Sequence, residues 1–569
     1  MASLTAKKVK GRTYYYLREC RRVQGKPKIV RQIYLGSAET IQRVFEQAEN
    51  PPAPSRVAVH QFGAVSALFG LAETIGIRDI VNTHVPKRDQ GLTCGDYLLL
   101  AVINRAVHPT SKAALADWYA TTVLDRMIPA PPALLASQRF WDHLGMLNEA
   151  KIAAIEQDLT RRIVQQYGID LSALVYDGSN FFTFIDSRTP GELAQRGHNK
   201  QKRTDLRQVS LGLLVSTDFH LPLLHVVYPG NVVDATEFKS LSDLLVERHK
   251  ALSGGCHDIT LIFDKGNNSQ EAFTTLDNSP YHFVGSLVPS QHEELLDVPL
   301  AKFHAMEDSR LEATQAYRTR KSVFGQERTI LVTHNPALLE GQLRGLSQHL
   351  DKARCKLAEL QGRLARWVQG RETRGRAPKL ASVERQVREI LSAQFLTQLL
   401  PVEIGQRNGM PTLSWQTDQN ALERLSNRLF GKTILFSDRE DWTDEQIVLA
   451  YRSQSKIEDV FKLMKHPTYL RWQPQYHWTN EMIRAHAFCC VLAVTLVSLL
   501  QRELARKGLT MSIPAILEEL CGVYETTFVY PGTTRRPVIK NLLADLTPTQ
   551  ENLLKLLGLT VPPPAASSR

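Results

Sequence analysis

The sequence predicts a mixed α/β protein with several domains, and three observations support that prediction. At 569 residues the chain is much longer than a single hydrophobic core requires. Between residues 171 and 287, short runs of β-branched and aromatic residues alternate with turn signals and helical patterns, as in a mixed sheet. Helical periodicity dominates the flanking region from 56 to 167 and returns after 436.

Composition and cysteine placement narrow the class of protein. Apolar residues make up 43% of the chain and charged residues 22%, which is ordinary for a folded globular protein. The seven cysteines include no C-x-x-C pair, so neither a disulfide framework nor a structural zinc site is indicated. No apolar signal-peptide core follows the basic N-terminus. We therefore expect a cytoplasmic protein.

Residues 1–50 form the first predicted region, a basic β-hairpin. Two extended segments flank a turn at 25–27, and tyrosines interleave the charges. The formal net charge of the chain is +11, and the first 35 residues hold ten Lys or Arg against one acid, Glu19. Such a surplus attracts phosphates, so DNA is an expected partner, with a solvated basic tail as the alternative. The hairpin residues expected to bind DNA are Lys26, Lys28 and Arg31.

A helical DNA-binding domain is predicted over 56–167. The periodic runs are 64–75, 94–107 and 111–124, and a Pro-rich linker at 50–55 precedes them. Helices alone do not establish a DNA contact, so the binding role rests on the rest of the chain.

Residues 168–288 are predicted as the first part of a sheet domain. The expected strands cover 173–177, 207–216, 221–228 and 259–264, with a last strand from Tyr281. Helices are expected after Asp234 and from Ser269. A strand, two hairpin-like strands, a helix, a strand and a second helix follow the order of the ribonuclease H-like fold. In that arrangement the two aspartates discussed below end the first and fourth strands.

An inserted domain with basic helices is predicted over 289–436, where it interrupts the sheet domain. Its candidate elements are strands at 316–322 and 328–332 and a long helix at 336–367. The stretch from 351 to 390 carries eleven Lys or Arg against five acids, which fits a solvated helix pair or a DNA contact equally well. An apolar stripe at helical spacing is expected to pack in a helical hairpin rather than a dimer. The stripe is Leu357, Leu360 and Leu364.

The second part of the sheet domain is predicted over 437–505, preceded by a strand at 433–436 and containing a helix at 443–465. The longest apolar run, 487–500, has fourteen residues and falls short of the roughly 20 that span a bilayer, so we expect a buried helix and no membrane contact. A C-terminal helical region with a Pro-rich, disordered tail is predicted over 506–569.

Three carboxylates are the candidate catalytic residues. Asp177 and Asp264 each end a short apolar run, which places a carboxylate at a sheet edge, and Glu458 lies on the helix at 443–465. Carboxylates that converge on one point repel each other unless cations neutralise them, and hard oxygen ligands select Mg²⁺ or Mn²⁺. The set therefore indicates metal-dependent phosphoryl transfer on nucleic acid.

The helix at 443–465 presents a polar face around Glu458. Tyr451 and Lys465 lie seven residues to either side, close to two helical turns, and Gln454 and Lys462 lie near the same face. One carboxylate between basic groups can offer a metal ligand with phosphate contacts beside it, although a plain surface helix has the same pattern.

These residues resemble the DDE transposases of bacterial insertion sequences, in the insertion-sequence-four superfamily and its insertion-sequence-sixteen-thirty-four-like branch. The superfamily signature is Tyr, two residues, Arg, three residues, Glu, six residues and Lys, and Tyr451, Glu458 and Lys465 match its spacing. The chain departs at Gln454, where the family has Arg. Further segments resemble family blocks, and together they cover nearly the whole chain: Asp264-Lys-Gly266, 205–208, 229–234 and 476–486.

The resemblance implies a ribonuclease H-like core, an inserted domain, and cleavage of terminal inverted repeats followed by joining to target DNA. It implies that Asp177 bridges two Mg²⁺ ions, for which Mn²⁺ can substitute, while Asp264 and Glu458 each complete one site. It further implies a homodimer or larger synaptic assembly in a bacterial cell, associated with the nucleoid. The side chains expected on DNA near the site are Tyr451, Gln454, Lys462, Lys465 and Arg207.

Alternative interpretations remain for residues and for function. A single aspartate after an apolar run is more often a helix cap or turn residue. His198, His477 and His486 lack zinc-ligand spacing. The chain could be an inactive or domesticated DNA-binding protein, or a ribonuclease H-like nuclease that cuts without joining; the three carboxylates and the basic hairpin favour a transposase. The rival aspartates are Asp186, Asp205, Asp218 and Asp234.

Overall fold

The computed structural model describes residues 2–23, 26–49, 53–86, 91–186, 188–199, 203–232, 258–371, 377–531 and 537–560, with the single residues 201 and 244. Of the predicted turn at 25–27, residue 25 lies outside these ranges, while Lys26 and Pro27 are wrong as turn residues because they are paired in a strand. The predicted helix after Asp234 and the predicted disordered tail from 561 lie outside or largely outside these ranges. The chain divides into two compact units. Unit 1 comprises residues 1–67, 119–129 and 515–569, and unit 2 comprises 68–118 and 130–514.

Unit 1 contains two small antiparallel sheets. The first has the order β1-β2-β3, and the second joins segments far apart in the sequence in the order β17-β16-β4. Glu525 of β16 is fully buried, and Arg126 donates to its carboxylate at 2.8 Å. The elements are β1 (Ala2–Val9), β2 (Arg12–Val23), β3 (Lys26–Gly36), α1 (Ala38–Glu49), β4 (Arg56–Gln61), the start of α2 (Gly63–Thr74), α6 (Leu124–Met127), most of α18 (Ile513–Cys521), β16 (Tyr524–Tyr530), β17 (Val538–Leu543) and α19 (Pro548–Leu557).

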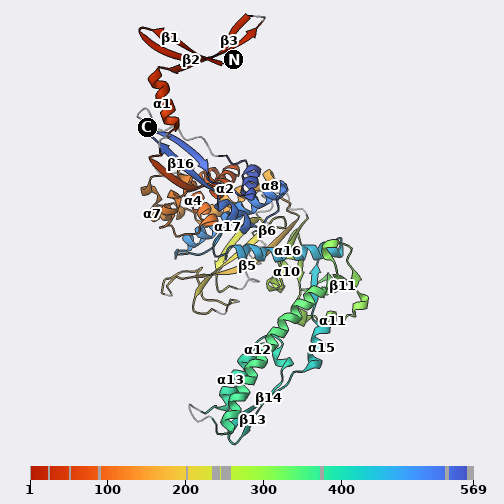
Figure 1. The fold of residues 1–569 in the computed structure, drawn as a ribbon. Helices are drawn as coiled ribbons and strands as arrows, with labels where there is room; N and C mark the ends of the chain where they lie inside the picture. The colour runs from red at the N-terminus through yellow and green to blue at the C-terminus, as the bar shows by residue number, and fades with distance from the viewer. Residues whose placement is uncertain are drawn as a thin grey trace. The chain divides into compact units, whose positions relative to one another are not determined.

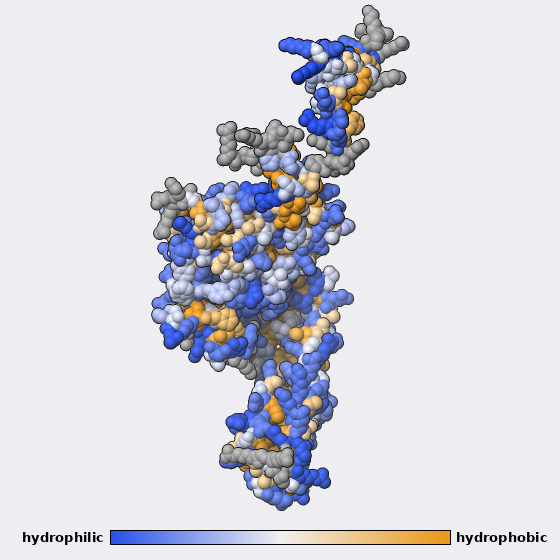
Figure 2. All heavy atoms as spheres, turned by 60° about the vertical axis from the view of Figure 1, so that its left-hand side comes forward, coloured by the Kyte–Doolittle hydropathy of each residue, from blue (hydrophilic) through white to orange (hydrophobic). Residues whose placement is uncertain are grey.

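Unit 1 corrects three predictions. The N-terminal hairpin is part of a three-stranded sheet, because β1 pairs with β2 from Ala2 to Val9. Residues 56–61, predicted at the start of a helical domain, form β4, which pairs with β16. The C-terminal region predicted as helical contains the strands β16 and β17. Figure 2 shows hydrophobic patches on the surface of the protein, and the exposed large hydrophobic residues of unit 1 include Leu4, Leu17, Val57, Val59 and Leu542.

Unit 2 contains a group of helices that precede the sheet strands in the sequence, together with α17. Its central helix α17 is long and apolar enough to cross a membrane, but 94% of its most apolar stretch is buried, so it is the buried core helix that the sequence predicted. It packs against α4, α7, α8 and β7. The helices are α3 (Ile77–His84), α4 (Cys94–Val107), α5 (Leu115–Ala120, which crosses into unit 1), η1 (Pro132–Leu135), α7 (Ser137–Leu144), α8 (Glu149–Tyr167) and α17 (Asn480–Arg506).

Unit 2 is built on a mixed nine-stranded sheet of order β10-β11-β12-β15-β9-β8-β5-β6-β7 (Figure 1). The strands β5, β8 and β9 are parallel, and all other neighbours are antiparallel. The sheet elements are β5 (Ala173–Thr183), β6 (Arg207–Ser216), β7 (Pro222–Pro229), β8 (Ile259–Ile262), η2 (Lys265–Asn267), α10 (Gln270–Asp277), β9 (Tyr281–Ser286), β10 (His304–Ala305), β11 (Gln315–Val323), β12 (Gln326–His334), β15 (Lys432–Ser437) and α16 (Asp444–Leu463).

The insertion is partly an extension of the sheet, which the sequence did not predict. Strands β10 to β12 join the sheet through β15, which pairs with β9. The rest of the insertion has its own core, in which Leu357, Leu360 and Leu364 pack with Val383 and Val387, so the predicted stripe forms a helical hairpin within the chain. Figure 1 shows α12 beside α13. The remaining elements are η3 (Pro289–Gln291), α11 (Glu293–Leu296), η4 (Leu300–Lys302), η5 (Ser309–Leu311), α12 (Pro336–Val368), α13 (Leu380–Ile390), α14 (Leu396–Leu399), β13 (Val402–Arg407), β14 (Met410–Trp415) and α15 (Gln419–Arg428).

Candidate active site

The two candidate aspartates occupy matched positions relative to two neighbouring parallel strands: Asp177 lies within β5, and Asp264 lies two residues beyond the end of β8. The β5–β8 ladder ends with Val175 opposite Ile262. Asp177 and Asp264 each lie two residues beyond these partners. Because side chains two residues apart share a face of a strand, and adjacent strands are about 4.8 Å apart, both carboxylates stand at one edge of the parallel sheet. Asp177 does not end its strand as predicted, since β5 continues beside β6 to Thr183.

Asp264 is held by two hydroxyl groups. Its Oδ1 accepts from Ser286 Oγ at 3.2 Å and lies 3.3 Å from the Tyr451 hydroxyl, which also contacts Ser286 Oγ at 2.9 Å. Burial, together with the negative charges of Asp264 and Glu458, raises the pKa of the Tyr451 phenol above its usual value. Tyr451 is therefore a neutral donor at neutral pH, and it links α16 to the aspartate.

Helix α16 is fixed against the sheet by its N-terminus and by its apolar face. Thr443 and Gln446 form a reciprocal capping box, which satisfies two backbone N–H groups of the first turn. The Arg318 guanidinium donates to Asp444 Oδ1 at 2.8 Å. Buried side chains such as Ile457 and Phe461 pack the helix against β5, β8, β9 and β15. The polar face of α16 is thus held at the same sheet edge as the aspartates.

Two contacts place Glu458 between the aspartate strands. Tyr451 reaches Asp264, and Lys465, just beyond the helix, donates from Nζ to Ser179 Oγ at 2.6 Å. Ser179 lies two residues after Asp177, on the same face of β5. Glu458 lies midway, about 10 Å along the helix from each contact, and its side chain is exposed. The contacts of Tyr451 and Lys465 therefore hold the part of α16 that carries Glu458 near the sheet edge with the two aspartates.

The oxygen donors at this edge suit a hard divalent cation. Asp177 and Asp264 are half-buried, and Glu458 is exposed on α16. Carboxylate oxygens are the ligands that Mg²⁺ and Mn²⁺ prefer. Within the described ranges no three His, Cys, Asp or Glu side chains are close enough to hold one ion, so the three carboxylates do not form a closed ligand shell.

The other residues predicted to bind DNA differ in their environments in the structure. Gln454 is half-buried on α16, between Tyr451 and Glu458. Lys462 forms an ion pair with Asp459 at 2.8 Å, and this contact raises the pKa of its ammonium group. Arg207 begins β6 and donates to the Thr189 carbonyl at 2.7 Å. In unit 1, Lys28 and Arg31 are exposed on β3, and Lys26 begins the same strand with its side chain outside the described part.

Arg452 does not replace the arginine that the resemblance leads one to expect at position 454. Its Nη2 donates to Thr314 Oγ1 at 2.7 Å and its Nη1 to the Arg310 carbonyl at 3.2 Å, so it binds the inserted segment. The chain therefore presents the Gln454 amide, and no arginine from these positions, on the face of α16 beside Glu458.

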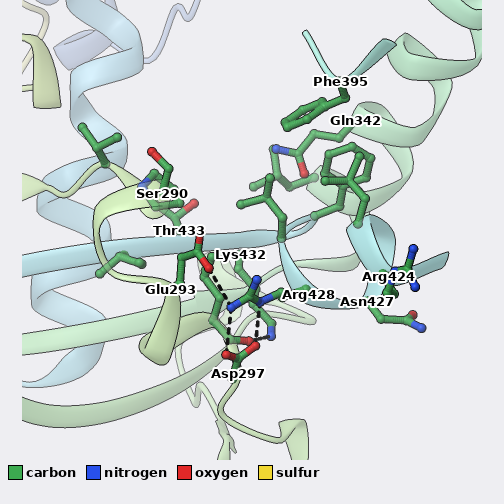
Figure 3. A pocket seen from close by; sticks show the side chains of 18 of the residues that line it. Ser290, Glu293, Asp297, Gln342, Phe395, Arg424, Asn427, Arg428, Lys432 and Thr433 are labelled. Atoms are coloured by element: carbon green, nitrogen blue, oxygen red, sulfur yellow. Dashed lines mark hydrogen bonds and ion pairs between the residues drawn. The ribbon is translucent and has the colours of Figure 1, made fainter. Parts of the chain in front are cut away.

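A cavity of about 1490 Å³ opens beside Asp264, with Ser286, Tyr451 and Lys265 in its wall. Its far wall comes from α12, α14 and α15 of the insertion. Figure 3 shows Arg428 bound to Asp297 and Glu293, at distances of 2.6 and 3.0 Å. Arg424 is exposed in the same wall and has no ion pair among the described residues. The described residues lining this space include four Lys or Arg and four Asp or Glu, so its charge is mixed.

Ser179 and Ser286 were missed as site residues. Both are small polar residues on strands that the sequence otherwise reads as apolar or turn-like, and neither is distinctive by type. Ser286 is the last residue of β9, which pairs with β8, the strand that precedes Asp264. Its position at the end of a predicted strand was therefore the one sequence feature that could have indicated a site residue.

The histidines considered as metal ligands have other environments. His486 is buried, and its Nε2 lies 2.9 Å from the Trp472 carbonyl oxygen. His198 contributes its backbone carbonyl to Gln208 Nε2 at 3.0 Å. His477 lies 5.7 Å from Trp141 between ring centroids, and burial together with the charges of Lys112 and Arg105 lowers the pKa of its imidazole to about 3.

Replacing His477 by Phe is expected to reduce acid destabilisation. The folded protein keeps this imidazole neutral while the unfolded chain binds a proton below pH 6.5, so the stability it contributes is lost as the pH falls from 6.5 toward 3. Unfolding in urea at about pH 7 and about pH 4.5 should show the variant gaining roughly 2 kcal/mol relative to the parent at the lower pH. The exposed His349→Phe change is the control, and equal pH dependence of all three proteins would contradict the assignment.

A comparison with protein-family models identifies a transposase domain in the chain. A family model described as "Transposase DDE domain" matches residues 182–496, more than half of the chain, a range that begins just after Asp177 and includes Asp264 and Glu458. No curated protein matches the chain.

Two solved structures are similar to the chain. The structure titled "Cryo-EM structure of piggyBac transposase synaptic complex with hairpin DNA" is 10% identical, with 80% of this chain and 79% of that chain covered and a TM-score of 0.35. The structure titled "Mos1 transposase paired-end complex with left transposon end" is 11% identical, with 35% of this chain and 60% of that chain covered and a TM-score of 0.15. The chain therefore spans less than two thirds of the second structure.

Proposed function

The chain belongs to the transposase DDE domain family, and from this premise we propose that it is an active DNA transposase that cuts terminal inverted repeats and joins the cut ends to target DNA. The observation that carries the proposal is the matched position of Asp177 on β5 and Asp264 just beyond the end of the neighbouring parallel strand β8, with α16 contacting Asp264 through Tyr451 and Ser179 of β5 through Lys465. A helix that contacts both strands in this way would present Glu458 to both aspartates.

The sheet order supports a ribonuclease H-like core within the larger sheet. Taken alone, β5 to β9 have the order third, second, first, fourth, fifth, with the first, fourth and fifth strands parallel. This is the arrangement that the predicted order of elements requires, and it brings the first and fourth strands side by side. The finer assignment to the insertion-sequence-four superfamily and its sixteen-thirty-four-like branch rests on Tyr451, Glu458 and Lys465 at the family spacing.

Asp177, Asp264 and Glu458 would hold two Mg²⁺ ions, or Mn²⁺ in their place. When bound, the ions would supply a polarised nucleophile and stabilise the leaving oxygen. The chain's own residues would position the DNA. Lys465 carries a positive charge beside Ser179, where it would bind a phosphate of the reacting strand. Tyr451 would keep Asp264 oriented, because its hydroxyl is a neutral donor.

Exposed cationic side chains besides Lys465 would bind the rest of the DNA. In unit 2, Arg424 and Lys265 are exposed in the walls of the large cavity beside Asp264. In unit 1, the sheet of β1 to β3 carries exposed Lys28 and Arg31. It also carries an aromatic cluster, in which the ring centroids of Tyr14 and Tyr16 lie 5.9 and 5.3 Å from that of Tyr34. Basic and aromatic groups together are typical of nucleic-acid surfaces. Two inverted repeats would be held by a dimer or larger assembly.

The proposal is tested with DNA that carries the sequences flanking the reading frame. The full chain with Mg²⁺ is expected to cut at the inverted-repeat boundary and then to join the new ends to a second DNA. Binding without cutting would favour the inactive or domesticated DNA-binding protein. Cutting without joining would favour the ribonuclease H-like nuclease.

A further inference from the structure

The insertion contacts the first half of helix α16 at several points. At the helix N-terminus, Arg318 of β11 donates to Asp444 Oδ1 at 2.8 Å, and His304 Nε2 of β10 lies 3.0 Å from Asp444 Oδ2. A third contact is made by Arg452, eight residues further along the helix. Of these three contacts, the one at Arg452 lies closest to Glu458 along the chain.

Arg452 and the start of helix α12 share one hydroxyl group. Arg452 Nη2 donates to Thr314 Oγ1 at 2.7 Å, and Asn335 Nδ2 donates to the same oxygen at 3.0 Å. Asn335 also caps α12, because its Oδ1 accepts from the Leu338 backbone N–H at 3.0 Å. Arg452 is exposed, but Thr314 is only 2% exposed, and a hydroxyl oxygen has two acceptor sites. We call Arg452, Thr314 and Asn335 the Thr314 junction.

The backbone is strained where it delivers Thr314 to this junction. Ala313 has a φ of 60°, in the left-handed region that is unfavourable for a residue with a Cβ atom. The turn is fixed by its neighbours: the Thr314 N–H donates to the carbonyl of buried Leu311 at 2.9 Å, and the Met306 N–H donates to the Thr314 carbonyl at 3.1 Å. Such strain persists only where the surrounding structure holds it, and it is concentrated at functional positions.

The stretch of α16 between Arg452 and Glu458 contains two features that weaken a helix. Ser453 Oγ donates to the Ala450 carbonyl, and Ser455 Oγ donates to the Arg452 carbonyl, each three residues earlier. Side chains that bond to carbonyls of their own helix compete with the backbone ladder and often bend the helix. A fixed point beside this stretch therefore helps to determine where Glu458 lies.

We propose that Arg452 is a positioning residue for Glu458, and that the Thr314 junction transmits the orientation of the inserted helix α12 to α16. Arg452 precedes Glu458 by six residues, or about 9 Å of helix rise, and its guanidinium binds the insertion, so it acts through the helix. Its position is not one of the signature positions of the family. The proposal rests on the proposed function, since the junction affects Mg²⁺-dependent chemistry through Glu458.

Amide hydrogen exchange of the full chain, without metal or DNA, tests the junction itself. Arg452→Met and Thr314→Val each remove a hydrogen bond of the junction and should speed exchange over residues 453–463 by about tenfold. Thr314→Ser keeps the hydroxyl group and should exchange at close to the parental rate. Asn335→Ser keeps a capping oxygen for α12 but withdraws the amide from Thr314, and it should speed exchange over 453–463 by about threefold.

Cleavage at varied Mg²⁺ concentration tests the effect on Glu458. Arg452→Met and Thr314→Val should raise the Mg²⁺ concentration for half-maximal cleavage by about tenfold, the lower end of the range for residues that orient metal ligands. Their affinity for the same duplex without Mg²⁺ should stay within about twofold of the parental value, because Arg452 binds the insertion.

Arg310→Met is the matched control for Arg452→Met. The Arg310 side chain donates to Asp308 at 2.6 Å, whereas its backbone carbonyl accepts from Arg452. The variant therefore removes a positive charge from the same neighbourhood and keeps the carbonyl that Arg452 uses. Exchange over 453–463 and the Mg²⁺ requirement should both stay at the parental values.

The contrary outcomes are distinguishable. Unchanged exchange over 453–463 in Arg452→Met would overturn the junction, and faster exchange with an unchanged Mg²⁺ requirement would overturn its role in positioning Glu458. Weaker DNA binding with an unchanged Mg²⁺ requirement would assign Arg452 to a DNA phosphate instead. Equal effects in Arg310→Met would show a general effect of charge. Absence of cleavage by the intact protein would overturn the proposed function, and the role of Arg452 in it, while hydrogen exchange would still show whether the junction holds α16.

Discussion

Asn in place of Asp264 is expected to abolish Mg²⁺-dependent DNA cleavage while the protein still binds DNA. The change removes the charge that a metal ligand requires but keeps the side-chain volume. The amide can still meet the hydroxyl groups of Ser286 and Tyr451, so the local fold should persist. Losing several kcal/mol of transition-state stabilisation corresponds to a rate decrease of about a thousandfold or more. Single-turnover cleavage of a labelled inverted-repeat duplex measures the effect, with gel-shift affinity measured beside it.

Asp186→Asn is the matched control for this experiment. Asp186 follows β5 closely in the sequence, is exposed, and pairs with Arg188 at 3.0 Å, which lowers the pKa of its carboxyl group. It has the same chemistry as Asp264 without its place beside Asp177, and the variant should cut at close to the parental rate. An Asp264→Asn protein that cuts DNA as fast as the Asp186→Asn protein would exclude Asp264 from the catalytic set.

Replacing Lys465 by Met is expected to slow cleavage by about 10- to 100-fold, the size expected for losing one charge-assisted hydrogen bond worth roughly 1.5–3 kcal/mol. Lys465 Nζ donates a hydrogen bond to Ser179 Oγ and lies 4.9 Å from the centre of the Phe181 ring. Lys465 lies at the end of the polar face of α16 that carries Glu458. The flexible Met side chain can occupy the same position over Phe181 without a charge. Cleavage rates at several DNA concentrations separate a weaker phosphate contact from a slower chemical step.

Lys462→Met is the comparison variant for Lys465. Lys462 lies on the same helix, but it is exposed and forms an ion pair with Asp459. Exposed pairs of this kind contribute about 0.2–1 kcal/mol, so the rate should change by less than about fivefold. Equal losses in the two variants would contradict a specific role for Lys465 and would indicate a general electrostatic attraction of DNA to α16.

Several elements could be predicted from the sequence because their patterns are local. Strand β6 begins at Arg207 and ends at Ser216 as predicted, and α4 covers Cys94–Val107 as predicted, since Thr93 and Asp96 cap a continuous apolar run. The predicted end of β5 was wrong, because it was based on local composition alone. The apolar run stops at Tyr176, but Gly178, Ser179 and Asn180 remain paired with β6, so the partner strand and not the composition determines where β5 ends.

Pairings between distant segments could not be predicted. Strand β4 is short and half-exposed, and its partner β16 lies more than 450 residues further along the chain, so no local signal connects them. Strands β11 and β12 were predicted as strands, but their union with the main sheet depends on β15, which stands between β12 and β9. At the candidate site, the spacing of Tyr451, Glu458 and Lys465 was readable from helical geometry, whereas Ser179 and Ser286 required the register of the sheet.

The central claim is that Asp177, Asp264 and Glu458 act as one set, and strand joining from ends that are already cut tests it most directly. This reaction does not depend on the earlier cleavage step. The intact protein with Mg²⁺ should join pre-cut inverted-repeat ends to a target plasmid. The Asp177→Asn, Asp264→Asn and Glu458→Gln variants should bind the same ends and give no joined product. Joining at the parental rate by any one of the three variants would contradict the account.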